Sequence, residues 1–160
     1  MSVYEFTKPE TWEKGEKMAI AKVLLVDDEV PFVEAMTRRL KKRELDVSTA
    51  FSGKEAFDRL TEEKSIEVVI LDVKMPGMDG VEVLREVKRR FPLVEVVMLT
   101  GHATVETAIE GMKLGAYDYL MKPCDIDILL TKVSEAAAKK RKHEDKIIEA
   151  RLKEITLRRT

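Results

Sequence analysis

Acidic, hydroxyl and amine side chains follow short apolar segments at four places in this chain. The acidic run Asp27-Asp28-Glu29 follows "KVLLV", and Asp72 follows "IEVVIL". Thr100 follows "VEVVML", and Lys122 stands two residues after "YDYL". Carboxylates that share a small region repel one another unless a cation joins them. Mg²⁺ prefers oxygen ligands, typically one or two carboxylates with water and a phosphate, so these acids are typical of a magnesium site.

Phosphoryl transfer is the chemistry that this combination suits. The carboxylate of Asp72 is a nucleophile that gives an aspartyl phosphate. The ammonium of Lys122 balances the carboxylate and a phosphoryl oxygen, and the hydroxyl of Thr100 can donate to another oxygen of the same group. An aspartate after a strand is by itself usually a cap or a turn residue. The ordered set of four is far more specific, and it predicts phosphorylation of Asp72.

Short apolar runs alternate with amphipathic segments from Lys22 onward, which indicates a doubly wound α/β fold with a five-stranded parallel sheet. In such sheets ligands bind beyond the carboxyl ends of the strands, so the four places converge on one rim. The strand before Asp72 is apolar on both faces, which predicts a central strand with Asp72 exposed at its end, followed by a Met-Pro-Gly loop. The expected strands span residues 22–26, 45–50, 66–71, 94–99 and 117–120. The segments between these strands are predicted to be helices, each of which packs one apolar face on the sheet. The apolar residues of the four faces are Phe32, Ala35, Met36 and Leu40; Ala56, Phe57 and Leu60; Val83, Leu84 and Val87; and Val105, Ala108, Ile109 and Met112.

Composition narrows the class of protein. The chain has 160 residues, 37% of them charged, with a formal net charge of -1. A chain of this length is expected to form one domain with an additional segment at each end. Its nearly balanced charge does not indicate direct binding of nucleic acid. Its single cysteine, Cys124, cannot form an internal disulfide and reads as a small apolar filler. Neither a leader nor a run of membrane-spanning length is present, so a reducing cytoplasm is the expected location.

The two ends of the chain differ from its middle. Residues 1–20 are polar with scattered aromatics and read as an N-terminal extension. From residue 125 to 160 there is neither Gly nor Pro, which predicts one continuous helix longer than a small domain is wide. Residues 139–160 form its basic tail, in which Ile147, Ile148, Leu152, Ile155 and Leu157 return after a polar stretch. The tail reads equally as a solvated extension or as a short seam of a homodimer.

Four signatures in this order carry a resemblance to a known family. "LLVDDE", "VILDVKMPGMDG", "MLTGHA" and "AYDYLMKP" are similar to the successive motifs of the receiver domain of two-component response regulators. The resemblance covers residues 21–138, about three quarters of the chain, and is closest to receivers of nitrogen-regulator-type transcription activators. It implies a flavodoxin-like fold with strand order 2-1-3-4-5.

The resemblance also implies a role for each matching residue. Asp72 is the phosphoacceptor, Asp28 a direct Mg²⁺ ligand, Asp27 a ligand through water, and the backbone carbonyl of Lys74 a further ligand. None of these residues departs from the family pattern, and neither do Thr100, Tyr119 and Lys122.

Thr100 and Tyr119 form the implied switch pair, and Lys122 binds the phosphate. The Lys122–Pro123 bond is cis in this family. Phosphorylation adds charge that draws Thr100 inward, and Tyr119 fills the vacated space, so the face of the fourth helix, fifth strand and fifth helix changes. Lys74 lies two residues past Asp72, and His102 lies two residues past Thr100. We hypothesise that these two residues set the lifetime of the aspartyl phosphate.

The sequence thus predicts a single-domain response regulator that takes a phosphoryl group from a sensor histidine kinase or phosphotransfer protein. Beyond phosphorylating and dephosphorylating itself it is not expected to be an enzyme, and its downstream protein is unknown. An alternative is the receiver part of a transcription activator without its output module. A haloacid-dehalogenase-type phosphatase also uses an aspartate, a hydroxyl, a lysine and Mg²⁺, but it needs a second aspartate where this chain has Lys74. A flavodoxin is weaker still, because the acids after the first strand would repel a flavin phosphate.

Overall fold

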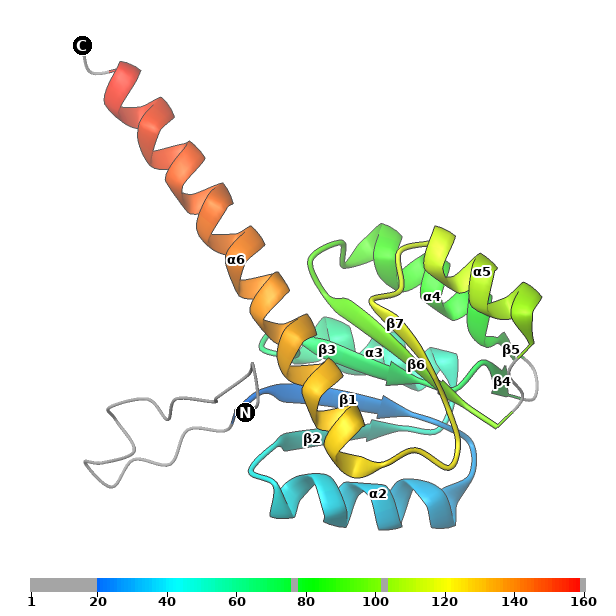
Figure 1. The fold of residues 1–160 in the computed structure, drawn as a ribbon. Helices are drawn as coiled ribbons and strands as arrows, with labels where there is room; N and C mark the ends of the chain where they lie inside the picture. The colour runs from blue at the N-terminus through cyan, green and yellow to red at the C-terminus, as the bar shows by residue number, and fades with distance from the viewer. Residues whose placement is uncertain (1–19, 76–77, 102–103, 159–160) are drawn as a thin grey trace.

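The structure, a computed structural model, describes residues 20–75, 78–101 and 104–158, and at residues 74, 75 and 78 it describes the backbone alone. Residues 1–19 of the expected N-terminal extension and His102 therefore lie outside the described residues. Figure 1 shows a twisted sheet flanked by helices, with one helix that continues far beyond it. Within the described ranges, no helix has the length and apolar character that a membrane span requires.

A five-stranded parallel sheet with the order β2-β1-β3-β6-β7 forms the centre of the fold. Its third strand in sequence, β3, lies in the middle of the sheet and is buried along its whole length. The strands are β1 (Lys22–Val26), β2 (Asp46–Ala50), β3 (Val68–Leu71), β6 (Glu95–Thr100) and β7 (Asp118–Met121). Since β6 and β7 are the fourth and fifth strands of this sheet, the predicted order 2-1-3-4-5 is confirmed, with strand ends that differ from the prediction by at most two residues.

The segment after Asp72 contains a small strand ladder that the sequence did not predict, and Pro76 and Gly77 of the predicted Met-Pro-Gly loop lie outside the described residues. Two short strands, β4 (Lys74–Met75) and β5 (Met78–Asp79), pair in antiparallel fashion, with Lys74 opposite Asp79. The side chain of Asp79 accepts from the backbone N–H of Val81 at 3.0 Å and begins the next helix. A small ladder therefore connects β3 to that helix.

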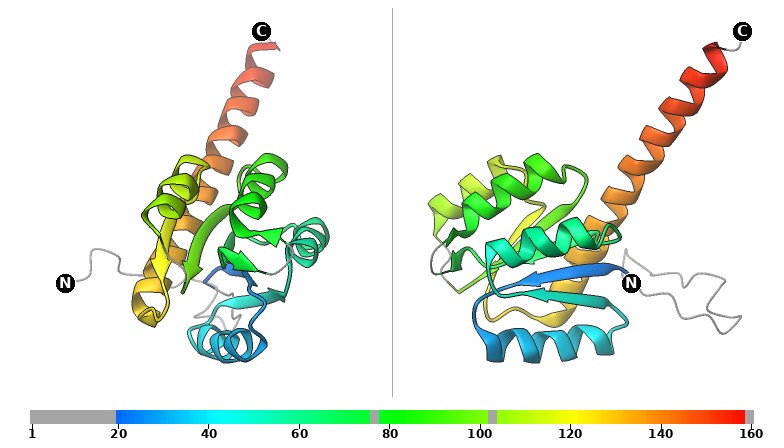
Figure 2. Two further views of the ribbon diagram at one scale, coloured as in Figure 1. Left: turned by 90° about the vertical axis from the view of Figure 1, so that its right-hand side faces the viewer. Right: turned by 180° about the vertical axis from the view of Figure 1, so that it is seen from behind.

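Five described helices cover the two faces of the sheet. They are α2 (Val30–Lys42), α3 (Gly53–Glu62), α4 (Gly80–Arg90), α5 (Val105–Lys113) and α6 (Ile126–Arg158). Figure 2 shows α2 and the first half of α6 on one face, with α3, α4 and α5 on the other. Each face has its own apolar core, because alternate residues of β1 such as Leu24 and Leu25 point to opposite sides. Such two-sided burial explains the continuous apolar strands.

Helix α5 does not pack as its sequence pattern predicts. The expected stripe is largely exposed: Val105 is 76% exposed, Ile109 50% and Met112 46%. The one buried residue of this helix is Gly111. A β-carbon on Gly111 would lie 2.8 Å from the Sδ of Met98 on β6, so the missing side chain allows the helix backbone to approach the sheet. The apolar side chains are left on the outer surface.

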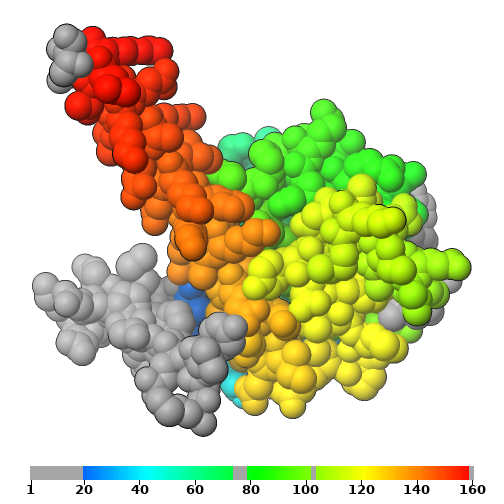
Figure 3. All heavy atoms as spheres, turned by 45° about the horizontal axis from the view of Figure 1, so that its top comes forward, coloured from blue at the N-terminus to red at the C-terminus, as the bar shows by residue number. Residues whose placement is uncertain are grey.

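Helix α6 confirms the predicted long C-terminal helix. It has 33 residues, and its buried residues end at Ala137. From residue 145 onward every described residue is exposed, and Figure 3 shows this part as a ridge that leaves the rounded body. Along it, Ile148, Leu152 and Ile155 recur at helical spacing and are exposed.

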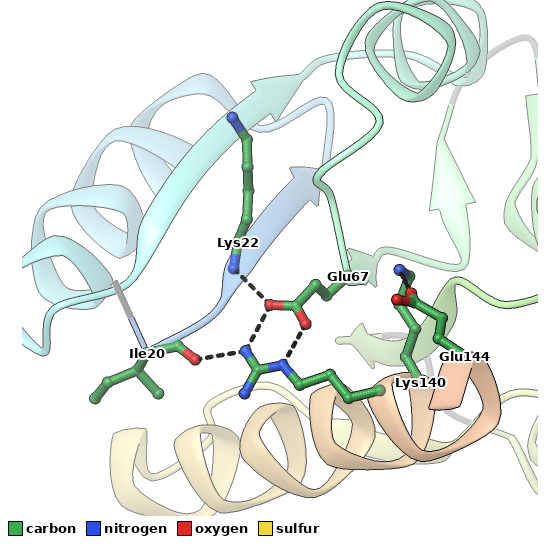
Figure 4. Close-up of polar contacts among 6 residues, drawn as sticks. Ile20, Lys22, Glu67, Lys140 and Glu144 are labelled. Carbon is green, nitrogen blue, oxygen red and sulfur yellow. Dashed lines mark hydrogen bonds and ion pairs between the residues drawn. The ribbon is translucent and has the colours of Figure 1, made fainter. Parts of the chain in front are cut away.

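Arg141 is the point at which α6 is tied to the body near the amino ends of the strands. Its guanidinium donates to both oxygens of Glu67, at 2.6 and 2.7 Å, and to the backbone carbonyl of Ile20 at 2.9 Å (Figure 4). Glu67 also accepts from the backbone N–H of Lys22 at 3.4 Å. A planar guanidinium with two parallel bonds to one carboxylate fixes orientation better than a single contact. This contact, the Arg141 clamp, therefore holds α6 to the body shortly before its fully exposed part.

Replacing Arg141 by Ala is expected to lower the free energy of unfolding by about 1 kcal/mol, because the pair is partly exposed and screened. Arg158→Ala is the matched control, since Arg158 bonds Glu154 on the same helix in full exposure and should change stability by less than about 0.5 kcal/mol. Urea unfolding of the two variants measures both values. Equal losses would show that the clamp contributes no more than a surface pair.

Candidate functional site

The register of the sheet brings the predicted acids together. Val26 of β1 is the partner of Leu71 of β3, so Asp27 and Asp72 leave adjacent strands at the same level. Backbone bonds continue past the strand ends: the N–H of Asp72 donates to the carbonyl of Val26 at 3.0 Å. The two side chains thus start from a rigid rim rather than from loops.

Three carboxylates form the acidic cluster of this rim: Asp27, Glu29 and Asp72. One oxygen from each lies within 4.8 Å of the others, an arrangement that could hold a metal ion. Asp27 is 1% exposed and Asp72 only 3%, whereas Glu29 is exposed. The sequence-based expectation of an exposed Asp72 is therefore wrong. Its side chain is almost fully covered, and the Lys122 ammonium lies 3.9 Å from its Oδ2.

Lys122 brings a positive charge into the acidic cluster. Its Nζ donates to Oδ2 of Asp27 at 2.6 Å and lies 3.8 Å from Oε1 of Glu29. The ammonium also sits 3.9 Å from the centre of the Phe32 ring, a cation–π contact with the first turn of α2. The Lys122–Pro123 peptide bond is cis, as the family resemblance implies. Lys122 is thus held between three carboxylates and an aromatic face.

Thr100 and Tyr119 lie on the neighbouring strands β6 and β7. Thr100 is fully buried, and its backbone carbonyl accepts from the N–H of Lys122 at 2.8 Å. Tyr119 is half-buried and packs against the core that the sheet forms with α3 and α4. Its hydroxyl lies 2.9 Å from Oγ1 of Thr107 on α5. In this structure Tyr119 is therefore engaged with the helix.

The remaining predicted residues have different outcomes. Asp28 is half-buried and is not among the three carboxylates that come together, so its role as a direct ligand stays a prediction. Lys74 lies in β4, immediately beyond the rim, and its side chain is outside the described part. Burial, together with the neighbouring Asp125, raises the pKa of the Cys124 thiol. A protonated thiol that packs against the core agrees with a filler rather than a reactive group.

Sequence reasoning missed three contributors to this site. Glu29 stood in the acidic run without a role, Phe32 was assigned only to a packing face, and Thr107 was not singled out. Local pattern carries no signal for Phe32 or Thr107, because their partners are distant in sequence and meet them only in the folded chain. Glu29 could have been found from its place in the run.

Comparisons with known proteins agree with this geometry. Residues 23–134 match the family model described as "Response regulator receiver domain". An NtrX-like response regulator of Rickettsia bellii is 37% identical over 133 residues, which are 80% of this chain and 28% of that protein. The DNA-binding transcriptional regulator NtrC of Klebsiella pneumoniae is 38% identical over 112 residues, 70% of this chain and 24% of that protein. The chain thus spans less than a third of the length of these relatives.

Solved structures show the same fold. A CheY-like receiver domain from Methanospirillum hungatei superposes with a TM-score of 0.72 at 27% identity, covering 77% of this chain and 98% of that one. NtrX from Brucella abortus superposes with a TM-score of 0.73 at 32% identity, covering 84% of this chain and 30% of that one. Together with the match over residues 23–134, the ordered rim of acids, threonine and lysine places this chain in the receiver domain family of two-component response regulators.

Proposed function

We propose that this chain receives a phosphoryl group on Asp72 from the histidine of a sensor kinase or phosphotransfer protein, in a reaction that requires Mg²⁺. The observation that carries the proposal is the convergence of Asp72, Asp27 and Lys122 at the carboxyl ends of the parallel strands. Residues 21–138 would form the receiver unit, and residues 139–160 would continue its last helix toward whatever the receiver controls.

The transfer moves one phosphoryl group between two side chains. An oxygen of the Asp72 carboxylate attacks phosphorus, the phosphorus–nitrogen bond to the donor histidine breaks, and the imidazole keeps the electron pair. The Lys122 ammonium, 3.9 Å from Asp72, is placed to neutralise a phosphoryl oxygen without forming a bond. Asp27 keeps that ammonium in place through the 2.6 Å contact.

The donor set fits Mg²⁺. Three carboxylates face one ammonium, so the acidic cluster keeps an excess of two negative charges, and two of its carboxylates are buried. Buried like charges are costly without a cation, and carboxylate oxygens are the ligands that Mg²⁺ prefers. Asp27, Asp72 and Glu29 would contribute to its site, and the family resemblance adds Asp28 and the carbonyl of Lys74. When bound, the ion supplies charge neutralisation for the phosphoryl oxygens.

The output would be read from the face made by α5, β7 and α6. Val105, Ile109 and Met112 of α5 are exposed, and Met121 of β7 is 60% exposed. An apolar surface that a soluble helix leaves uncovered suits contact with a partner protein or with a second copy. Phosphorylation would alter this face through Thr100 and Tyr119. Lys74 and His102 remain the proposed determinants of phosphate lifetime.

The second candidate function is that of the receiver part of a longer transcription activator. The curated relatives are more than three times as long as the matched segment, and α6 projects beyond the body as a connecting helix would. In that case the tail would carry the signal to an output module. A phosphatase of the haloacid dehalogenase type is not favoured, because Lys74 occupies the position at which that mechanism needs an acid.

The proposal is tested by exposing the protein to acetyl phosphate with Mg²⁺ and, in parallel, with excess chelator. We expect intact-mass spectrometry to show one added phosphoryl group with Mg²⁺ only, and borohydride reduction to place it at Asp72. Beryllofluoride, a phosphoryl analogue, should bind only when Mg²⁺ is present. Modification without a divalent ion, or at another residue, would contradict the assignment.

A further inference from the structure

Four contacts meet at the hydroxyl of Thr107, at the beginning of α5. Its Oγ1 lies 3.2 Å from the backbone N of Thr104, 3.1 Å from the carbonyl of Thr104 and 2.9 Å from the Thr104 hydroxyl. The fourth contact is Tyr119, whose hydroxyl lies 2.9 Å away. Thr104 in turn accepts from the N–H of Thr107 at 3.1 Å, which completes a reciprocal cap of the helix.

The four contacts of the Thr107 hydroxyl exceed by one the number of hydrogen bonds that it can make at the same time. A threonine hydroxyl has one proton and two lone pairs, so it makes three bonds at a time. The proton goes to the Thr104 carbonyl and one lone pair accepts from the Thr104 N–H. The second lone pair can accept from the hydroxyl of either Tyr119 or Thr104. If Tyr119 leaves, Thr104 takes its place, so release of the tyrosine leaves no unsatisfied group on Thr107.

Tyr119 also touches α5 a turn further on. Gly111 is four residues after Thr107 and therefore lies on the same side of the helix. A β-carbon on Gly111 would be 3.8 Å from Cδ2 of the Tyr119 ring. Tyr119 therefore lies beside α5 at Gly111, the buried residue of this helix, as well as at Thr107.

We propose that Thr107 is a positioning residue that holds Tyr119 in its observed position beside α5 and couples its release from that position to the attachment of α5. The proposal rests on the function proposed above, in which Tyr119 turns inward toward Thr100. While the Thr107–Tyr119 bond is made, the inward position is disfavoured and α5 stays anchored. When the bond breaks, the cap survives through Thr104, and α5 is freed as an intact helix whose outer side chains are Val105, Ile109 and Met112.

Four variants separate this bond from the helix cap. Thr107→Val keeps the branched shape but removes the hydroxyl, and with it both the bond to Tyr119 and the Thr107 half of the cap, whereas Thr107→Ser keeps the hydroxyl. Tyr119→Phe removes the other partner and leaves the cap intact. Thr104→Ala weakens the cap by removing its side-chain acceptor but keeps the Thr107 hydroxyl. The double variant Thr107→Val with Tyr119→Phe completes a cycle for the bond.

Two measurements are made on each protein: amide hydrogen exchange of α5, and the beryllofluoride concentration that gives half-saturation with Mg²⁺. Loss of one net hydrogen bond should raise the population of the inward state and tighten beryllofluoride binding about 2- to 10-fold in Thr107→Val and in Tyr119→Phe. The double variant should bind no more tightly than the tighter single variant. Thr107→Ser should match the wild type, and Thr104→Ala should speed exchange without tightening binding.

The failing outcomes are distinct. Additive effects of Thr107→Val and Tyr119→Phe would show that the two residues act separately, and tightening by Thr104→Ala would assign the effect to the cap. Either result overturns the role of Thr107. If the wild type does not bind beryllofluoride at all, the proposed function fails instead. Hydrogen exchange then still tests the bond, because Tyr119→Phe should loosen α5 in the unmodified protein and unchanged exchange would overturn it.

Discussion

Replacing Asp72 by Asn is expected to reduce phosphoryl incorporation from acetyl phosphate by at least about a thousandfold, because the amide removes the nucleophilic oxygen that forms the acyl phosphate. Asn has nearly the shape of Asp, and one charge fewer in the buried acidic cluster removes repulsion, so the variant should stay folded. The affinity of the variant for Mg²⁺ should fall, because the acidic cluster then has one negative charge fewer. Intact-mass spectrometry over time measures incorporation, and thermal unfolding with and without Mg²⁺ measures fold and metal binding.

Asp58→Asn is the matched control for this substitution. Asp58 is an exposed aspartate on α3, away from the rim, and its replacement should leave both incorporation and the effect of Mg²⁺ unchanged. Persistent Mg²⁺-dependent phosphorylation of the Asp72→Asn protein would remove the central assignment. A loss that Asp58→Asn shares would indicate a general effect of charge rather than of the nucleophile.

Replacing Gly80 by Ala is expected to destabilise the protein by about 3 kcal/mol, the upper end of overpacking effects. A β-carbon at this position would overlap the backbone carbonyl oxygens of Asp72 and Val73 and the α-carbon of Val73. These atoms cannot move by changing a rotamer, since they belong to the chain that leaves β3. The N–H of Gly80 donates to the Val73 carbonyl at 2.7 Å, which draws the two segments together.

Gly101→Ala provides the comparison, because a β-carbon there meets nothing within 4 Å. That variant should differ from the wild type by less than about 0.5 kcal/mol in urea unfolding. The Gly80→Ala protein should also take up phosphate more slowly under folding conditions, because the strain falls on the backbone of Asp72. A Gly80→Ala protein as stable as Gly101→Ala would mean that α4 can shift away from β3 at little cost.

Much of the site follows from local sequence. Asp27, Asp72, Thr100 and Lys122 each stand at or just after the end of an apolar run, and parallel strands bring such ends to one edge. The long helix α6 was likewise predictable, because a segment without Gly or Pro continues as a helix. The two-sided apolar strands indicated burial between helical layers, whereas the strand order came from the resemblance to receiver domains.

Helix α5 shows where sequence pattern fails. Its apolar residues Val105, Ile109 and Met112 have helical spacing, and pattern alone directs them to the core. The structure turns the helix so that Gly111 faces the sheet and those side chains face outward. Pattern records which residues share a face, whereas the choice of buried face depends on how closely two backbones can approach.

The sequence by itself determined the chemistry of this protein: which strand ends carry acids, a hydroxyl and an amine, and that they share a rim. Tertiary structure alone decided that Asp72 is covered, that Glu29 joins the acidic cluster and that Phe32 lies under Lys122. It also decided that Tyr119 is bonded to Thr107. Those features depend on contacts between side chains from different elements, and such contacts are fixed by packing distances that local sequence does not encode.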